Sequence, residues 1–235
     1  MTGSQHPEFF FKTVTIKLNS MDSSKNTQPE LRRPSWLVIG CVLGLCVSVA
    51  PVYLSTFSVF LLPISEEFGW SRGNMSTIFA ITALAIAVAS PAIGVLMKRI
   101  GARRVLMIGI FAFTISLLAV SRAPNEFTTY LFLSAVLGLT GAATNTFVYI
   151  SILPQWFSNR LGLMLGLAMT GIGIGATVTP VLSQVLISEF GWRNAYVFLA
   201  SLPMIVALPC VVFLIKERLP STLTETLTES SITND

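Results

Sequence analysis

Six long stretches of the chain carry no charged residue and are solidly apolar. They cover 34–65, 73–97, 105–121, 127–159, 161–188 and 194–215. A helix that spans a bilayer needs about 20 mostly apolar residues, whereas barrel strands would alternate with a period of two, which these stretches do not. The pattern predicts an all-α membrane protein with six transmembrane helices, at about 36–61, 75–97, 105–121, 129–153, 161–187 and 196–215. The third predicted helix has only 17 residues, so we expect it to extend by a further turn.

The composition supports a membrane protein and excludes most other classes. Of 235 residues, 53% are hydrophobic and 11% are charged, against roughly 25% charged in soluble domains. The three cysteines lie inside apolar stretches, so we interpret them as packing residues, and the sole histidine, His6, lies in the polar N-terminal tail. Without a nucleophile–base pair or a group of metal ligands, the sequence predicts no enzyme, no metal and no cofactor. The net charge of +4 does not indicate nucleic-acid binding, because the basic residues lie in the tails and short connections.

The positions of Lys and Arg predict the orientation of the helices. All but three of these 15 residues lie in the N-terminal tail, the second and fourth connections and the C-terminal tail; the three are Arg72, Arg122 and Arg193. Basic residues concentrate in cytoplasmic connections, so we expect both termini in the cytoplasm. The expected domain organisation is a cytoplasmic tail, a six-helix bundle and a second cytoplasmic tail, at 1–35, 36–215 and 216–235.

The second connection, GVLMKRIGARRVL at 94–106, combines four cations with two glycines. It resembles the signature loop of the major facilitator superfamily, whose pattern is G-x-x-x-D-R-x-G-x-R-R. The matching residues are Gly94, Arg99, Gly101, Arg103 and Arg104. The resemblance implies an inner gating loop, but Lys98 stands where the family has an Asp that takes part in a charge relay closing the cytoplasmic side. An ordinary basic turn would explain the charges of this loop but not the spacing of its glycines.

Three further segments narrow the resemblance. They look like the bacterial branch of the superfamily that is related to monocarboxylate porters and the oxalate:formate antiporter, and they are 53–72, 154–175 and 190–196. The resemblance implies the N-terminal half of a twelve-helix transporter, with a 3+3 repeat of helices, in a bacterial inner membrane. It also implies a small organic anion such as a monocarboxylate as the solute, with a proton as a candidate coupling ion.

The C-terminal tail resembles the start of a linker between two transporter halves, truncated after a few residues. We therefore expect a second six-helix half as a partner, in addition to the lipid bilayer. A homodimer or a separate chain would supply this half.

Uncharged polar residues follow one face of three predicted helices. By analogy with the corresponding helices of the superfamily, we expect them to line a substrate path: Ser48, Ser55, Asn145, Tyr149, Thr170, Thr177 and Gln184. Polar side chains such as Asn and Gln are costly against lipid and need partners. For any one of these residues, hydrogen bonding between helices is an equally good interpretation.

Two short patterns predict contacts between helices and with the membrane interface. Three pairs of glycines are four residues apart within predicted helices, which allows close approach of two helix backbones: Gly40 and Gly44, Gly162 and Gly166, and Gly171 and Gly175. The tripeptide Phe-Gly-Trp occurs at 68–70 and again at 190–192, each time preceded by Glu and followed by Arg within two residues. We interpret both copies as turns at the membrane interface.

The leading hypothesis is half of a secondary active transporter that works by alternating access. No charged residue lies in any predicted helix. The resemblance implies that an anionic solute is held by an Arg or Lys from the six helices of the second half. Two alternatives stay open: a membrane interaction or regulatory module without transport, and a truncated, non-functional fragment.

Overall fold

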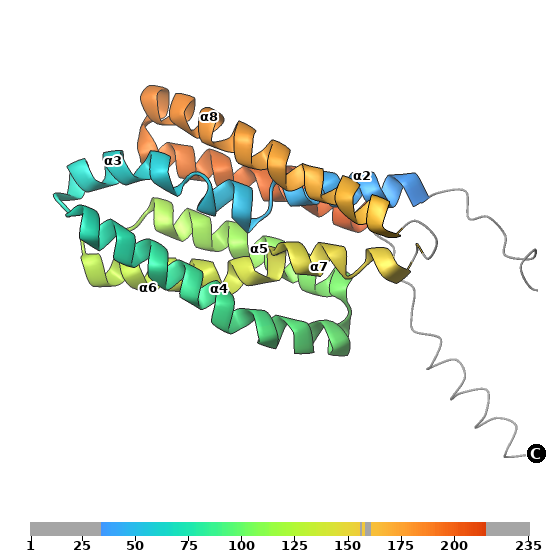
Figure 1. The fold of residues 1–235 in the computed structure, drawn as a ribbon. Coiled ribbons are helices and arrows are strands. Elements are labelled where there is room, and N and C mark those ends of the chain that lie inside the picture. The colour runs from blue at the N-terminus through green and yellow to red at the C-terminus, as the bar shows by residue number, and fades with distance from the viewer. Residues whose placement is uncertain (1–33, 156, 158–160, 215–235) are drawn as a thin grey trace, which may run out of the picture. The chain divides into compact units, whose positions relative to one another are not determined.

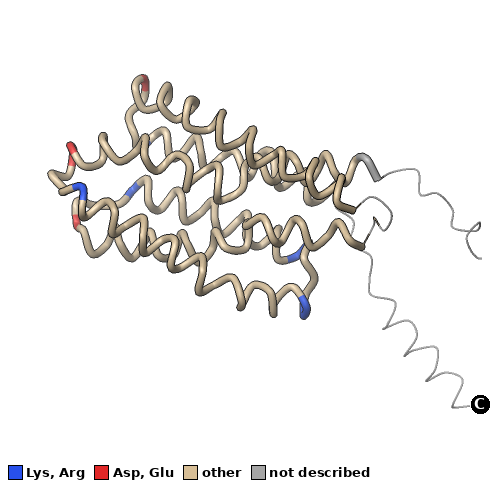
Figure 2. Tube along the Cα trace, in the orientation of Figure 1, with Lys and Arg blue, Asp and Glu red and all other residues tan. Residues whose placement is uncertain are grey.

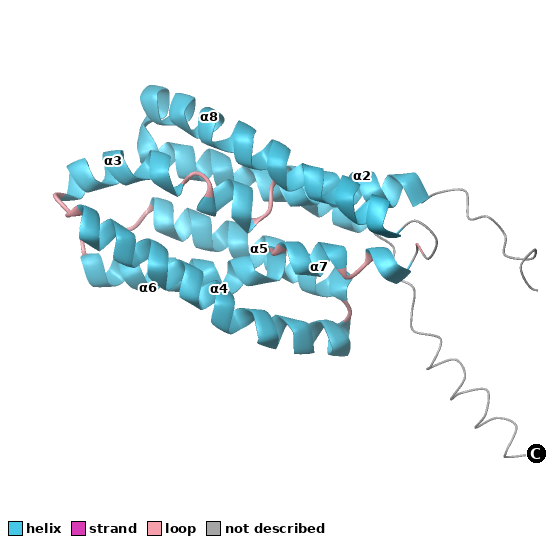
Figure 3. Cartoon of the chain, viewed as in Figure 1, coloured by secondary structure: helices cyan, strands magenta, loops and turns pink. Residues whose placement is uncertain are grey.

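The computed structural model describes residues 34–155, 157 and 161–214, and this part of the chain consists of helices and short connections (Figure 3). The prediction of an all-α protein is confirmed. The two predicted tails fall almost entirely outside the described residues, and so does Arg160 in the fourth connection.

Five stretches of the described chain are long and apolar enough to cross a membrane. The first combines α2, η1 and α3, the second and third are α4 and α5, the fourth combines α6, η2, α7 and η3, and the fifth combines α8, η4 and η5. Their bounds are α2 Pro34–Cys46, η1 Ala50–Leu54, α3 Phe57–Phe68, α4 Arg72–Ile100, α5 Ala102–Ser121, α6 Phe127–Gly141, η2 Ala142–Thr144, α7 Thr146–Ile150, η3 Leu153–Gln155, α8 Leu161–Leu202, η4 Pro203–Ala207 and η5 Cys210–Leu214.

The fifth stretch contains two helical legs that run in opposite directions (Figure 1). The chain reverses at Gly191, whose φ of 77° and ψ of 161° lie outside the helical region and suit only glycine. The first leg, 161–190, and the second leg, from 192 onward, correspond to the last two predicted helices. The described chain therefore forms six rods, and the first rod packs beside η5 at the end of the last.

The two rods that are single helices begin and end within a turn of their predicted bounds. α4 starts at Arg72 because Ser71 caps it: the Ser71 hydroxyl accepts a hydrogen bond from the backbone N–H of Asn74 at 3.2 Å. α5 begins at Ala102 and has 20 residues, so the third helix has the extra turn that its short apolar stretch required.

Packing of the rods produces one bundle with polar ends. α4 packs against α6, the first rod packs against α8, and α5 contacts both α6 and α8. Figure 2 shows the charged residues of the described chain at the two ends of the bundle. This is the charge distribution that a bilayer requires of helices that cross it.

The close contact predicted for Gly162 and Gly166 is not found, because a Cβ added to either meets no atom within 4 Å. The close contact predicted for Gly171 and Gly175 is confirmed. Both residues are buried on the first leg of α8, and a Cβ added to either would overlap a backbone carbonyl oxygen of α2, at Val42 and Cys46 respectively. The two helix backbones therefore touch, and only glycine leaves room for this approach.

Candidate functional site

The first rod is interrupted in its middle. Regular α-helix stops between α2 and α3, where the π-helical turn η1 intervenes (Figure 3). Pro51 lies in this turn and has no N–H to offer to the helix ladder. The hydroxyls of Ser48 and Ser55 donate to the carbonyl oxygens of Leu45 and Pro51, at 2.9 and 2.6 Å. Such bonds from short polar side chains to the preceding turn bend helices, so the sequence itself accounts for the break.

The fourth rod is interrupted as well, between α6 and α7. The 3-10 turn η2 follows α6, and Asn145 then takes an extended conformation with ψ of 159°. Its side-chain Oδ1 accepts a hydrogen bond from the backbone N–H of Thr146 at 2.7 Å, so Asn145 caps α7. The half-buried Asn145 thus fixes the place where helix resumes.

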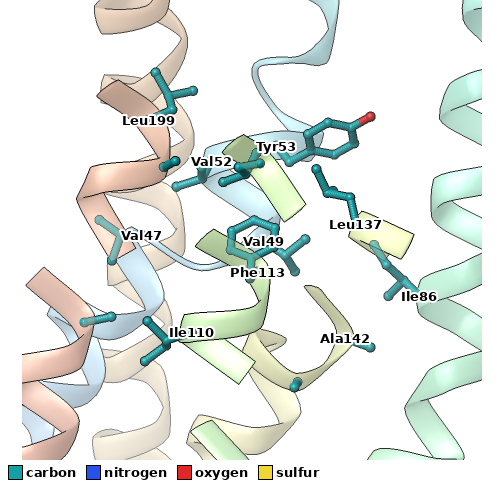
Figure 4. Close-up of a cluster of buried hydrophobic side chains, with 14 of the residues drawn as sticks. Val47, Val49, Val52, Tyr53, Ile86, Ile110, Phe113, Leu137, Ala142 and Leu199 are labelled. Carbon is teal, nitrogen blue, oxygen red and sulfur yellow. The ribbon is translucent and has the colours of Figure 1, made fainter. Parts of the chain in front are cut away.

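The two breaks lie against each other inside the bundle. A Cβ added to Gly141, the last residue of α6, would lie 2.7 Å from Cγ2 of Val49 just before η1. Figure 4 shows Val49 next to Phe113 of α5, among buried side chains of several rods. At membrane depth, backbone outside regular helix is tolerated only where protein covers it or where it lines a cavity, and broken helices form the solute sites of many transporters. The paired breaks are therefore the candidate functional site.

Two buried tyrosines lie beside the breaks. The ring of Tyr149 in α7 packs so closely on α2 that a Cβ added to Gly44 would overlap it. Tyr53 in η1 has its hydroxyl beside those of Thr82 and Ser134, at a geometry that makes no hydrogen bond. Neither tyrosine hydroxyl bonds any group in the described part of the chain. Burying a hydroxyl without a partner costs about 1–3 kcal/mol, so these groups are candidates for contact with a polar ligand.

The structure brings four of the seven predicted path residues to the breaks: Ser48, Ser55, Asn145 and Tyr149. The other three lie on the exposed face of the first leg of α8, and they are Thr170, Thr177 and Gln184. The two threonine hydroxyls bond carbonyl oxygens of their own helix at 2.7 and 2.8 Å. A face that is exposed in this chain can line a path only if another bundle lies opposite, so the role of these three residues stays a prediction.

Sequence reasoning missed Tyr53 and Thr82. Both are fully buried, from the first rod and from α4, and they meet Ser134 of α6. Each is an uncharged polar residue inside an apolar stretch, which was the available signal. The sequence does not show whether such a side chain points into the bundle or towards lipid.

The basic loop between α4 and α5 lies at one end of the bundle (Figure 2). Lys98 and Arg99 occupy the last turn of α4, where cations interact favourably with the negative end of the helix dipole. Gly101 ends the helix with φ of 89°, a conformation that favours glycine, and Gly94 has no atom within 4 Å of an added Cβ. A cation at position 98 therefore suits the helix end where the family places a carboxylate.

Arg103 connects this loop to the last rod. Its guanidinium donates a hydrogen bond from Nη2 to the carbonyl oxygen of Val212 in η5, at 2.7 Å and between segments 109 residues apart. The Arg103 guanidinium thus satisfies a backbone carbonyl oxygen in the last described turn of this rod. Arg104, by contrast, is exposed.

Comparison with known proteins agrees with this architecture. Residues 31–233 match the Major Facilitator Superfamily. Rat monocarboxylate transporter 13 is 29% identical over 76% of this chain and 41% of its own length, and human monocarboxylate transporter 11 is 34% identical over 67% and 33%. A probable L-galactonate transporter of Escherichia coli (strain K12) is 26% identical over 66% of this chain and 34% of its own. The matched part of this chain thus spans about two fifths or less of the length of these relatives. Since the family match covers most of the chain, the protein belongs to the Major Facilitator Superfamily.

Proposed function

We propose that this chain is a six-helix half of a secondary transporter for small organic anions, with monocarboxylates as the solute class. The observation that carries the proposal is the meeting of two broken rods inside the bundle, with Asn145 and the unpartnered Tyr149 hydroxyl beside them. Membership of a superfamily of transporters supports it, and so do relatives whose names include monocarboxylate transporters.

The charge distribution supports a solute path completed by a second bundle. In the described rods, every Lys, Arg, Asp and Glu lies in an end turn or a connection (Figure 2). A carboxylate held at the breaks would meet hydroxyl, amide and backbone groups of this chain but no cation. The cation is therefore assigned to a second six-helix bundle, from a second copy of this chain or a separate chain, and the two bundles alternate in access as they rock against each other.

The remaining assignments follow from this arrangement. The protein is an integral membrane protein, and we place both tails and the loop with Arg99, Arg103 and Arg104 on the cytoplasmic side, where this loop serves the inner gate. The membrane is a bacterial inner membrane or the corresponding cell membrane, since the relatives come from mammals and from a bacterium. A proton is the proposed coupling ion.

Flux through liposomes tests the proposal. The purified chain is reconstituted alone at densities that give monomers or dimers, and together with the C-terminal six helices of a relative. Saturable uptake of labelled lactate above that of empty liposomes is expected only for the dimer or for the complemented chain. Absence of uptake under every condition would remove the transporter function for this chain.

Replacing Tyr149 by Phe tests the contact between the breaks and the solute. We expect the KM for lactate to rise about tenfold or more, the factor for loss of one hydrogen bond to a charged group. The thermal midpoint of the protein should stay the same or rise, because the change removes a buried hydroxyl without a partner. The control is Ser90→Ala in α4, whose hydroxyl bonds only the carbonyl of its own helix. Equal KM values for the Tyr149→Phe variant and the control would contradict the assignment.

A further inference from the structure

The two Phe-Gly-Trp turns pack against each other at the end of the bundle opposite the basic loop. Gly69 and Gly191 both have positive φ, of 67° and 77°, so each turn reverses the chain tightly. Phe68, Trp70 and Trp192 pack into the bundle, whereas Phe190 is exposed. The rings of Phe68 and Trp192 lie edge to face with centroids 5.7 Å apart, and Trp70 adds a second contact to Phe68 at 4.6 Å. The two copies of the tripeptide therefore contact each other through these aromatic rings.

A single carboxylate connects the two turns. Glu67, in the last turn of α3, accepts hydrogen bonds from Trp192 Nε1 on one oxygen and from the Arg193 guanidinium on the other. The bond to Arg193 is also the one ion pair among the residues that the structure describes. Because each oxygen has its own donor, a side chain that offers a single acceptor oxygen cannot keep both bonds.

Arg193 extends this contact to a third rod. Its guanidinium carbon lies 4.3 Å from the centroid of the Trp192 ring and 5.5 Å from that of Phe68, so it is held between aromatic faces. The Arg193 backbone carbonyl accepts a hydrogen bond from the Ser121 hydroxyl at the end of α5, at 2.9 Å. Glu67 therefore ties α3 to a residue that is itself fixed to the second leg of α8 and to α5.

α3 is a short arm between this contact and the break in the first rod. It has 12 residues, and between it and α2 lie the π-helical turn and the hydroxyls that bond back to the helix. Its apolar contact with the bundle is one narrow face, formed by Phe57, Phe60, Ile64 and Phe68. α3 thus has an irregular backbone at one end, where it can bend, and the hydrogen bonds of Glu67 at the other end, which hold it in place. A segment with these two features can move as a hinge.

We propose that Glu67 is the latch of a hinged arm: it holds α3 to the second leg of α8, and its release lets α3 open about the break while α2 stays packed. Opening of α3 would uncover the two breaks from this end of the bundle. The role of the latch in transport rests on the proposed function, whereas the hinge and the latch can be measured without any solute or second bundle.

Hydrogen exchange of the full chain in lipid nanodiscs, followed by mass spectrometry, tests the latch. Glu67→Gln keeps the size of the side chain but leaves one acceptor oxygen and no charge for two donors. We expect exchange of α3 amides to accelerate severalfold, because the exposed ion pair and the part-buried hydrogen bond from Trp192 are weakened together, with exchange of α2 unchanged. Glu66→Gln is the matched control, because Glu66 is the neighbouring exposed acid and has no ion pair or hydrogen bond with any described residue.

A second variant separates a latch from a general loss of packing. Arg193→Gln should accelerate α3 as Glu67→Gln does, and the double variant should add little, because both changes break one unit. The proposal is overturned if Glu67→Gln and Glu66→Gln give the same exchange of α3, or if α2 and α3 accelerate equally. Neither result would touch the proposed transport function, and absent flux would leave the latch in place.

Discussion

Gly175→Ala is expected to destabilise the protein severely, although alanine is the better helix former. The added methyl group would overlap the carbonyl oxygen of Cys46 and lie 2.8 Å from Cβ of Pro51. Backbone atoms of α2 cannot yield as a flexible side chain would, so the two helices must separate. Overpacking of this kind typically costs about 1–3 kcal/mol and sometimes more. The thermal midpoint of the solubilised chain should fall by several degrees, and Gly171→Ala should act in the same direction because of its contact with Val42.

Gly173→Ala is the matched control, two residues away on the same leg. An added Cβ there meets no atom within 4 Å, so the only effect is the gain of about 1 kcal/mol in helix propensity. The midpoint of this variant should rise slightly or stay constant. Equal shifts for Gly173→Ala and Gly175→Ala would show that α2 and the first leg of α8 are not in backbone contact.

Asn145→Leu is expected to abolish solute uptake and to weaken α7. Leucine cannot accept the hydrogen bond that the Thr146 N–H donates to Asn145. Loss of a helix cap typically lowers the free energy of unfolding by about 1 kcal/mol. Leucine also places an apolar side chain at the break. Uptake of labelled lactate by the reconstituted assembly should fall to the level of empty liposomes, while the thermal midpoint should drop only modestly.

Asn145→Ser distinguishes a solute contact from capping alone. Serine keeps an acceptor for the cap but removes the amide, so under our proposal uptake falls with serine as well, at unchanged stability. Wild-type uptake with serine would restrict Asn145 to capping. A membrane interaction module without transport would instead tolerate Asn145→Leu together with Gln184→Leu, and would still bind its partner protein.

The rods could be predicted from the sequence because charge alone marks where a helix leaves the bilayer. α4 and α5 follow the uncharged stretches to within a turn. Gly101 and Gly191 both have positive φ, and each lies in a connection between two predicted helices. The spacing of Gly171 and Gly175 predicted a close helix contact, because in lipid only small residues let helix backbones approach, but the same spacing at Gly162 and Gly166 gives no such contact.

The interior of the bundle could not be predicted in the same way. The break in the first rod lies in an apolar stretch whose hydropathy is high throughout, so only Pro51 and Ser48 hint at it. The first leg of α8 carries small and polar residues on two faces, and the sequence alone does not say that Gly171 and Gly175 turn to α2 while Thr177 is exposed. The ion pair of Glu67 with Arg193 joins residues 126 apart, and it follows only once the rods are packed.

Modification of a cysteine at the break is the most direct test that the solute path runs between the broken rods. Ser55→Cys changes one hydroxyl of the first rod into a thiol. The chain without this substitution gives the background rate of labelling, which comes from Cys41, Cys46 and Cys210. The reagent is a water-soluble maleimide, applied to the assembly that takes up lactate. We predict that position 55 reacts faster than this background and that lactate slows the reaction at concentrations near its KM. A position that does not react above background, or whose rate no carboxylate alters, would contradict a solute path at the breaks.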